Sequence, residues 1–135
     1  MKNVVVKGAG IIVLLMLAFL VRSPAVHATD IQVNEGQSIQ EAINRAQPGD
    51  TVTVQKGTYT EALTIDQSIS LIGEEGAVID GNGTGNVITI TGNDITIEGL
   101  TVQNSGVDAT DSGIYVQEGQ NHIIKDNVLK DTMHG

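Results

Sequence analysis

The sequence predicts an all-β fold, a right-handed parallel β-helix of about three turns that a short helix caps at its amino end. Three observations predict it: short apolar-alternating strands recur about every 25 residues, turn residues separate them, and one amphipathic helix precedes them. Three strands per repeat describe a coil whose turns stack about 4.8 Å apart. The right hand follows from the handedness rule for parallel connections.

The repeat is clearest in ITIEGLTVQNS, residues 95–105, whose skeleton returns 27 residues later in HIIKDNVLKDT, residues 122–132. Paired positions define three sets of strands: Leu63/Ile65, Ile88/Ile90 and Ile114/Val116; Ile69/Leu71, Ile95/Ile97 and His122/Ile124; Ala77/Ile79, Leu100/Val102 and Asn127/Leu129. Within each pair the residues lie two apart, as one face of a strand requires. Asn127 takes the place of Leu100, so we expect an inward Asn that bonds to the backbone of a tight bend and stacks with asparagines in adjacent turns.

The corners of the coil are predicted at residues that tolerate sharp turns. The Glu98-Gly99 step is expected to be the corner between two strands of one turn, and Asn104-Ser105 to begin the next corner. Six glycines near strand ends are expected to turn the chain with positive φ: Gly73, Gly76, Gly92, Gly99, Gly113 and Gly119.

One helix is predicted, over SIQEAINRA, residues 38–46. Its apolar face is formed by Ile39, Ala42, Ile43 and Ala46. Ser38 and Glu41 have the spacing of a capping box, and the Pro48-Gly49 pair ends the helix. A short one-sided helix needs an apolar surface to cover, so we expect it to cap the first turn.

The chain divides into three segments. Residues 1–28 are predicted to be a signal peptide, because a lysine-bearing start, an apolar run of 14 and the small-residue site VHA follow one another. A membrane anchor is the alternative, but the run is shorter than the roughly 20 residues of a spanning helix. Residues 29–50 are expected to hold an N-terminal strand and the capping helix. Residues 51–135 are expected to hold the β-helix turns, truncated at the C-terminus. Export to the periplasm or extracytoplasmic face follows.

Composition restricts the partners. The chain has no cysteine, so neither disulfides nor thiolate metal sites are available. Without Lys2, Lys7 and Arg22 of the signal, four bases stand against sixteen acids, a formal charge of −12. Nucleic acid is therefore an unsuitable partner, since phosphate backbones attract clusters of Lys and Arg.

The mature sequence contains, in order, IQVNEGQSIQEAINRAQPGDTVTVQKGTYTEALTI, then SISLIGEEGAVIDGNGTG, then ITIEGLTVQNSG and DSGIYVQEGQNHIIKDNVLKDTMHG. Together these stretches carry a resemblance to the amino-terminal part of NosD-type proteins. It implies an exported accessory protein that assists copper-centre maturation of nitrous oxide reductase, with an ABC transporter membrane component and the other maturation proteins as partners. Members of that family are several times longer, so we expect residues 128–135 to leave an open strand edge and an open apolar interior.

Two alternatives remain. The stretch PGDTVTVQKGTYTE also occurs in carbohydrate-active β-helix proteins, such as polysaccharide lyases, pectinesterases and epimerases. The mature chain has few aromatic residues for stacking on sugars, only Tyr59 and Tyr115, and no cluster of bases for polyuronates, so a sugar ligand is expected to be disfavoured. A structural surface β-helix is the other alternative. No catalytic constellation is recognised, and the sequence predicts no enzyme.

DGNGTG, residues 80–85, matches the first half of a calcium loop. Asp80, Asn82 and Thr84 alternate before Gly85, but position twelve is Thr91 instead of a bidentate Glu. The stretch is therefore predicted to be a turn. It is not a phosphate cradle either, since no helix follows it.

Two further groups of side chains are candidates for a site. His122, Met133 and His134 have side chains that copper accepts, but His122 aligns with apolar Ile95 and is predicted to be a strand position. Asp108 and Asp111 form the best pair of carboxylates and are predicted to be solvated turn residues, because no substrate cleft is evident. The sequence assigns no catalytic, cofactor-binding or metal-binding residue, and copper is implied only by the resemblance.

Overall fold

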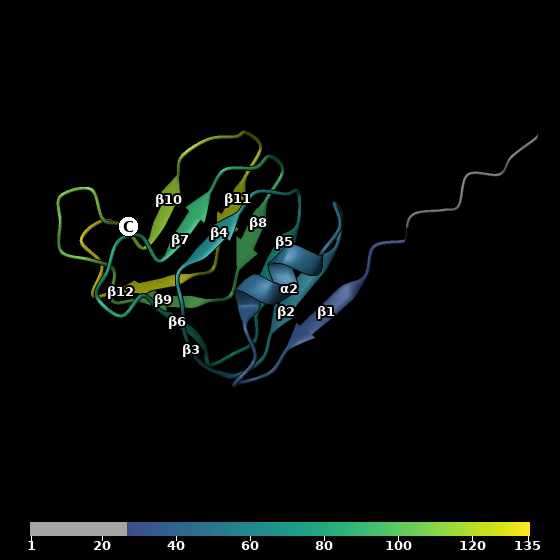
Figure 1. Ribbon diagram of the computed structural model, residues 1–135, viewed down its shortest axis with the longest axis horizontal. Coiled ribbons are helices and arrows are strands. Elements are labelled where there is room, and N and C mark those ends of the chain that lie inside the picture. Colours follow the sequence, from purple (N-terminus) through teal and green to yellow (C-terminus); the bar gives the residue numbers. More distant parts are fainter. Residues whose placement is uncertain (1–26) are drawn as a thin grey trace, which may run out of the picture.

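The computed structural model describes residues 27–135, and they form a coil with three parallel sheets on its sides (Figure 1). Sheet A contains β1 (Asp30–Val33), β2 (Thr51–Val54), β5 (Ser70–Gly73), β8 (Thr96–Glu98) and β11 (Ile123–Lys125). Sheet B contains β3 (Gly57–Thr60), β6 (Ala77–Asp80), β9 (Thr101–Gln103) and β12 (Val128–Lys130). Sheet C contains β4 (Leu63–Ile65), β7 (Ile88–Ile90) and β10 (Ile114–Val116). One helix, α2 (Ile39–Arg45), follows β1.

The coil has about four turns, which corrects the predicted three. The additional turn holds β2 and β3. Its strands repeat at a shorter step: Thr51 pairs with Ser70, 19 residues on, whereas Ser70 pairs with Thr96, 26 residues on. Later turns carry longer corner loops, so a search at one fixed period does not find the first turn. The parallel β-helix itself is confirmed, and its right hand stays a prediction.

The three predicted sets of strand positions are confirmed by the register of the sheets. Leu71 pairs with Ile97 and Ile97 with Ile124, while Ile79 pairs with Val102 and Val102 with Leu129. These inward residues stack on each other from turn to turn. Leu71, Ile79, Ile97 and Val102 are fully buried, and each contributes about 1.5–3 kcal/mol to folding.

The corners use more than glycine. Gly76, Gly99 and Gly119 have positive φ as predicted. Gly73, Gly92 and Gly113 do not, so the prediction is wrong for these three. Gly73 is needed for space instead, since a Cβ there would lie 2.6 Å from Leu100 Cδ2. Six Asn and Asp residues also have positive φ, a conformation they tolerate better than most side chains: Asn82, Asp94, Asn104, Asn121, Asp126 and Asp131.

The helix α2 closes the amino end of the coil, as predicted. Ile39, Ala42 and Ile43 are buried, and the helix contacts β1, β2 and β4. Its Gln40 amide binds the outer edge of β4: Oε1 accepts the Thr64 N–H at 2.8 Å and Nε2 donates to the Thr64 carbonyl at 3.1 Å. A side chain thus replaces a neighbouring strand, and the edge of sheet C is blocked.

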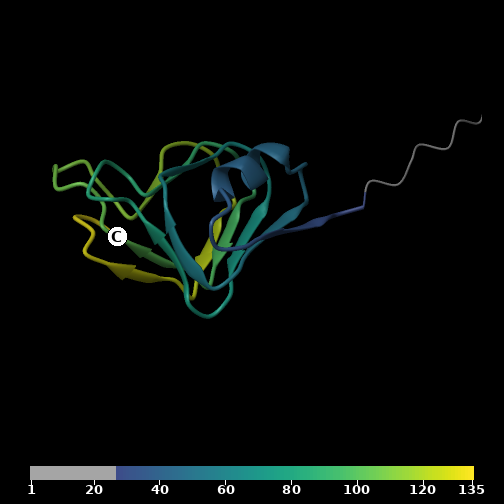
Figure 2. The ribbon, with the colours of Figure 1, turned by 60° about the horizontal axis from the view of Figure 1, so that its bottom comes forward.

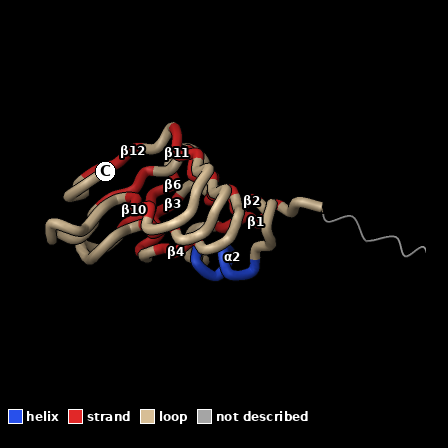
Figure 3. Tube along the Cα trace, turned by 90° about the horizontal axis from the view of Figure 1, so that it is seen from above, coloured by secondary structure: helices blue, strands red, loops and turns tan. Residues whose placement is uncertain are grey.

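The last turn lies at the opposite end of the coil from α2 (Figures 2 and 3). Its apolar side chains are partly exposed: Ile123, Ile124, Val128 and Leu129. The predicted signal peptide, residues 1–28, lies outside the described residues apart from His27 and Ala28. Within residues 27–135, no helix has the length and apolar character needed to cross a membrane.

Candidate functional site

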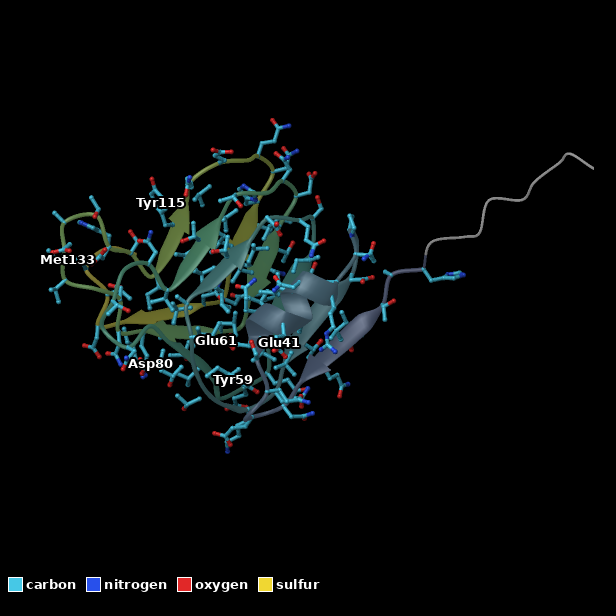
Figure 4. The ribbon with its side chains drawn as sticks, viewed as in Figure 1. Glu41, Tyr59, Glu61, Asp80, Tyr115 and Met133 are labelled. Atoms are coloured by element: carbon cyan, nitrogen blue, oxygen red, sulfur yellow. The ribbon has the colours of Figure 1, made fainter. Side chains whose placement is uncertain are left out.

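The outer face of sheet C carries a row of polar and aromatic side chains. Thr64, Thr89 and Tyr115 pair in register across β4, β7 and β10, between the inward residues of each strand. Tyr115 is 42% exposed, and Figure 4 shows it on β10, at the outside of the coil. Since the strands stack about 4.8 Å apart, equivalent side chains recur at a constant spacing along this face.

Two long corner loops border that row. Residues 81–87 connect β6 to β7 and residues 104–113 connect β9 to β10. The loops touch where the Gly106 N–H donates to the Gly85 carbonyl at 2.8 Å. A Cβ at Gly106 would collide with the Asp111 carboxylate and with the Gly85 backbone, so only glycine permits this approach.

A surface hollow of about 420 Å³ lies between these loops and Tyr115. It is lined by Gly85, Asn86, Ala109, Thr110, Asp111, Ser112, Tyr115 and His134. The Asn86 Oδ1 atom accepts the Ser112 N–H at 2.8 Å and fixes the loop to the preceding turn. Within the described chain, no intramolecular hydrogen bond uses the hydroxyls of Thr110 or Tyr115. The hollow therefore presents hydroxyl groups beside an aromatic ring.

Asp80 lies at a second hollow, of about 450 Å³, beside the end of β6. Its Oδ1 accepts the Asn82 N–H at 2.8 Å, and its Oδ2 accepts Gln103 Nε2 at 2.8 Å and Asn104 Nδ2 at 2.7 Å. The hydrogen bond from Gln103, with those from Asn82 and Asn104, holds the pKa of Asp80 below its ordinary value. Thr84 Oγ1 donates to the Gly81 carbonyl at 3.2 Å. The predicted calcium-like stretch is thus a turn in which both carboxylate oxygens of Asp80 already have protein donors.

Asp108 and Asp111 occupy one turn of the loop at residues 104–113. Asp111 Oδ2 accepts the Asp108 N–H at 3.0 Å, and the Asp111 N–H donates to the Asp108 carbonyl at 2.9 Å. The Asp111 carboxylate therefore stabilises the turn, as the sequence predicts, and at the same time forms part of the wall of the hollow.

The residues considered for copper do not assemble a site. His134 Nε2 lies 3.1 Å from the Ala109 carbonyl, and Met133 is 52% exposed on the loop at the left of Figure 4. The residue before β11, His122, aligns with Ile95 as predicted, and both of its ring nitrogens are buried without a hydrogen-bond partner among the described residues. Over residues 27–135, no three His, Asp or Glu side chains converge as metal ligands.

Asn127 binds the corner of the preceding turn. Its Oδ1 accepts the Leu100 N–H at 3.0 Å and its Nδ2 donates to the Ile97 carbonyl at 3.0 Å. The predicted bonding to the backbone of a tight bend is confirmed. The predicted stacking with other asparagines is wrong, because the equivalent position in the turn below is Leu100.

The sequence alone does not point to the hollow beside Tyr115. In the sequence, Tyr115 is simply one of two tyrosines, and the residues of the two loops are common in turns. The available signal is the alternation Ile114-Tyr115-Val116, which places the ring outward between two inward residues.

No family model matches the sequence, and no curated protein matches it. Among solved structures, the chain is similar to a mutant pectin methylesterase in complex with a hexasaccharide, with 22% sequence identity and a TM-score of 0.58. The match covers 80% of this chain and 46% of that one, so the chain spans less than half of that protein's length. This likeness shows a shared parallel β-helix fold.

Proposed function

We propose that this chain is part of an exported β-helix protein that binds a polysaccharide along the outer face of sheet C. One observation carries the proposal: Tyr115 is exposed beside a hollow lined with polar side chains, at the end of a row that begins with Thr64 and Thr89. Sugar rings stack on aromatic side chains while their hydroxyls seek hydrogen-bond partners. A polymer with a repeating unit suits a face whose side chains recur at constant spacing.

The charge of the chain selects the kind of sugar. Sixteen acids against four bases in residues 29–135 repel a polyuronate, and paired Arg donors suited to carboxylates are lacking since Arg45 is the one arginine there. A neutral chain, or one whose carboxylates are esterified, avoids this repulsion. The similar pectin methylesterase was crystallised with a hexasaccharide, which makes oligosaccharides of this length the first ligands to test.

The proposed activity is binding without turnover. Asp111 is the single carboxylate in the wall of the hollow, and its Oδ2 is committed to the Asp108 N–H. General acid–base catalysis on a sugar uses a second titratable group at a defined distance. His134 also lines the hollow, and its Nε2 lies 3.1 Å from the Ala109 carbonyl.

An accessory role of the NosD type, with an ABC transporter membrane component and nitrous oxide reductase maturation proteins as partners, is the second candidate. Two features favour it: the acidic charge and the scarcity of aromatic residues. Both suit a protein partner with a basic surface better than they suit a glycan. Deleting the gene in its native host separates the two candidates. Loss of copper-loaded nitrous oxide reductase supports the second, and loss of glycan binding at the cell surface supports the first.

Binding is tested by titrating the full chain with esterified and de-esterified oligogalacturonides and with neutral oligosaccharides, followed by isothermal calorimetry. We expect the esterified or neutral chains to bind and Tyr115→Ala to weaken binding roughly two- to thirteenfold, the effect of losing about 0.5–1.5 kcal/mol of stacking. Tyr115→Phe keeps the ring and should retain most of the affinity. Thr101→Ala on the outer face of sheet B is the matched control.

Equal affinities of the Tyr115→Ala and Thr101→Ala variants would remove sheet C from the proposal. Release of methanol or of shortened oligosaccharides in the same samples would show turnover and overturn the assignment of binding alone.

A further inference from the structure

Among the described residues, 27–135, the first backbone hydrogen bonds of the coil are made by Thr29. Its N–H donates to Asp50 Oδ1 at 2.8 Å, and its carbonyl accepts the Thr51 N–H at 2.9 Å. His27 and Ala28, which precede it, are exposed, and neither makes a hydrogen bond to another described residue. The bond between Ala28 and Thr29 is therefore accessible and lies directly outside the first fixed point of the fold.

Asp50 is a buried carboxylate at this point, only 5% exposed. Its Oδ2 accepts the Gln47 N–H at 2.8 Å while its Oδ1 faces the Thr29 nitrogen. These two backbone donors, Gln47 first, hold the pKa of Asp50 below its ordinary value. The one ion pair of the described residues joins Lys125 to Glu98, so no Lys or Arg pairs with Asp50. The buried Asp50 carboxylate thus accepts hydrogen bonds from neutral backbone donors and has no cationic partner among the described residues.

We propose that hydrolysis of the Ala28–Thr29 bond is the maturation step of this protein, and that the α-ammonium group it creates binds Asp50. Water adds across the peptide bond: Ala28 leaves as a carboxylate, and the Thr29 nitrogen becomes an amine that takes up a proton at neutral pH. The nitrogen that now donates one neutral hydrogen bond to Asp50 Oδ1, at 2.8 Å, then carries a positive charge beside that carboxylate.

The new charge strengthens an existing contact. A charge-assisted hydrogen bond is roughly twice as strong as a neutral one, and no rearrangement is needed because Asp50 is already held by Gln47. Processing would therefore strengthen the existing attachment of the first strand, β1, to the start of β2. The neighbouring acid, Asp30, is engaged elsewhere, since its Oδ1 accepts Thr53 Oγ1 at 2.6 Å. The inference rests on the proposed export and is independent of the proposed glycan ligand.

The test exports the full chain from a bacterial host and determines the N-terminus of the product by mass spectrometry. Two further changes form a cycle: Asp50→Asn, and insertion of Gly-Ser between Ala28 and Thr29, which moves the ammonium group two residues outward. We expect a product that begins at Thr29. We also expect the insertion to lower the folding constant about three- to tenfold when Asp50 is present, and to leave it unchanged within error in the Asp50→Asn background.

A second measurement applies if the Asp50→Asn variant does not fold. The α-amine of the processed chain should react more slowly with an acylating reagent than the amine of the insertion variant, because the ion pair withholds it. A product that begins elsewhere overturns the cleavage site. Equal reaction rates, or equal effects of the insertion in both backgrounds, overturn the pairing with Asp50.

Discussion

The Glu61 carboxylate caps the amino end of the helix α2, although it lies 22 residues after Ile39 in the sequence. Its Oε1 accepts the Ile39 N–H at 2.7 Å, and its Oε2 accepts the Gln40 N–H at 3.3 Å and the Ser38 hydroxyl at 3.0 Å. The predicted capping box is half correct: the Glu41 N–H donates to Ser38 Oγ at 3.2 Å, while the acid that faces the first-turn N–H groups comes from Glu61 (Figure 4). A negative charge at the helix start also suits the helix dipole.

Replacing Glu61 by Ala should therefore destabilise the protein by about 1 kcal/mol, the usual cost of losing a cap. Equilibrium unfolding in urea, followed by circular dichroism, measures it. Glu41→Ala is the matched control and should cost less, because its carboxylate is exposed at the helix surface. An equal loss in both variants would assign the capping to Glu41.

Ile43 is fully buried between the helix and the first turn. An Asp at this position would bury a charge without a partner, so we expect Ile43→Asp to cost several kcal/mol and to unfold the amino end of the coil. Ile43→Val should cost about 0.5–1.5 kcal/mol. Thermal unfolding of both variants checks the order, and equal melting temperatures of Ile43→Asp and the parent would show that the helix does not support the coil.

Asp80 should make the protein sensitive to acid. Hydrogen bonds from Gln103, Asn82 and Asn104 hold the folded-state pKa of Asp80 below its ordinary value of 3.8. Its ionised form therefore stabilises the fold above that value, and the contribution is lost as the pH falls through the folded-state pKa. Unfolding free energies measured from pH 6 downward should fall less steeply below about pH 3.8 for Asp80→Asn than for the parent. Parallel curves would remove Asp80 from the acid transition.

Tyr59 should make the stability of the fold depend on pH in alkaline solution. Its hydroxyl donates to the Val33 carbonyl at 3.0 Å or to the Gln55 carbonyl at 2.9 Å. Burial, and then the charges of Glu35 and Glu61, raise the pKa of Tyr59 above its ordinary value of 10.0. The neutral form therefore contributes stability that is lost as the pH rises above 10.0 through the folded-state pKa.

Tyr59→Phe should cost about 1 kcal/mol at neutral pH, from the lost hydrogen bond, and should flatten the alkaline limb of the stability curve. The exposed Tyr115→Phe serves as its control. If Tyr115→Phe flattened that limb equally, the effect could not be attributed to the buried hydroxyl.

The last turn should make the chain associate. Ile123 is 53% exposed and Val128 49% exposed, on edge strands whose outer N–H and C=O groups have no neighbouring strand in the described coil. Sedimentation velocity across a concentration series should show self-association. Ile123→Lys with Val128→Lys should suppress it, whereas Thr58→Lys on β3 should not. A monomer at all concentrations would contradict this expectation.

The inward positions of the coil were predictable because each depends on a local property. Ile97 lies on the same face of its strand as the residues two positions before and after it. The residue one repeat earlier, Leu71, occupies the same register position. Alternation and period can be seen without knowing what the strand touches. The amphipathic face of the helix, with Ile39 and Ile43, was found for the same reason.

The sequence by itself thus determined the parallel coil, the capping helix and the residues that fill the interior, since apolar periodicity reports burial wherever the chain folds. The tertiary structure alone decided the number of turns, the cap from Glu61, the strand-like contacts of Gln40 and the hollow beside Tyr115. Each of these joins residues 19 or more positions apart, and their meeting depends on loop lengths and stacking register. Loop conformation and stacking register depend on how all the turns pack together, so a local sequence pattern does not predict them.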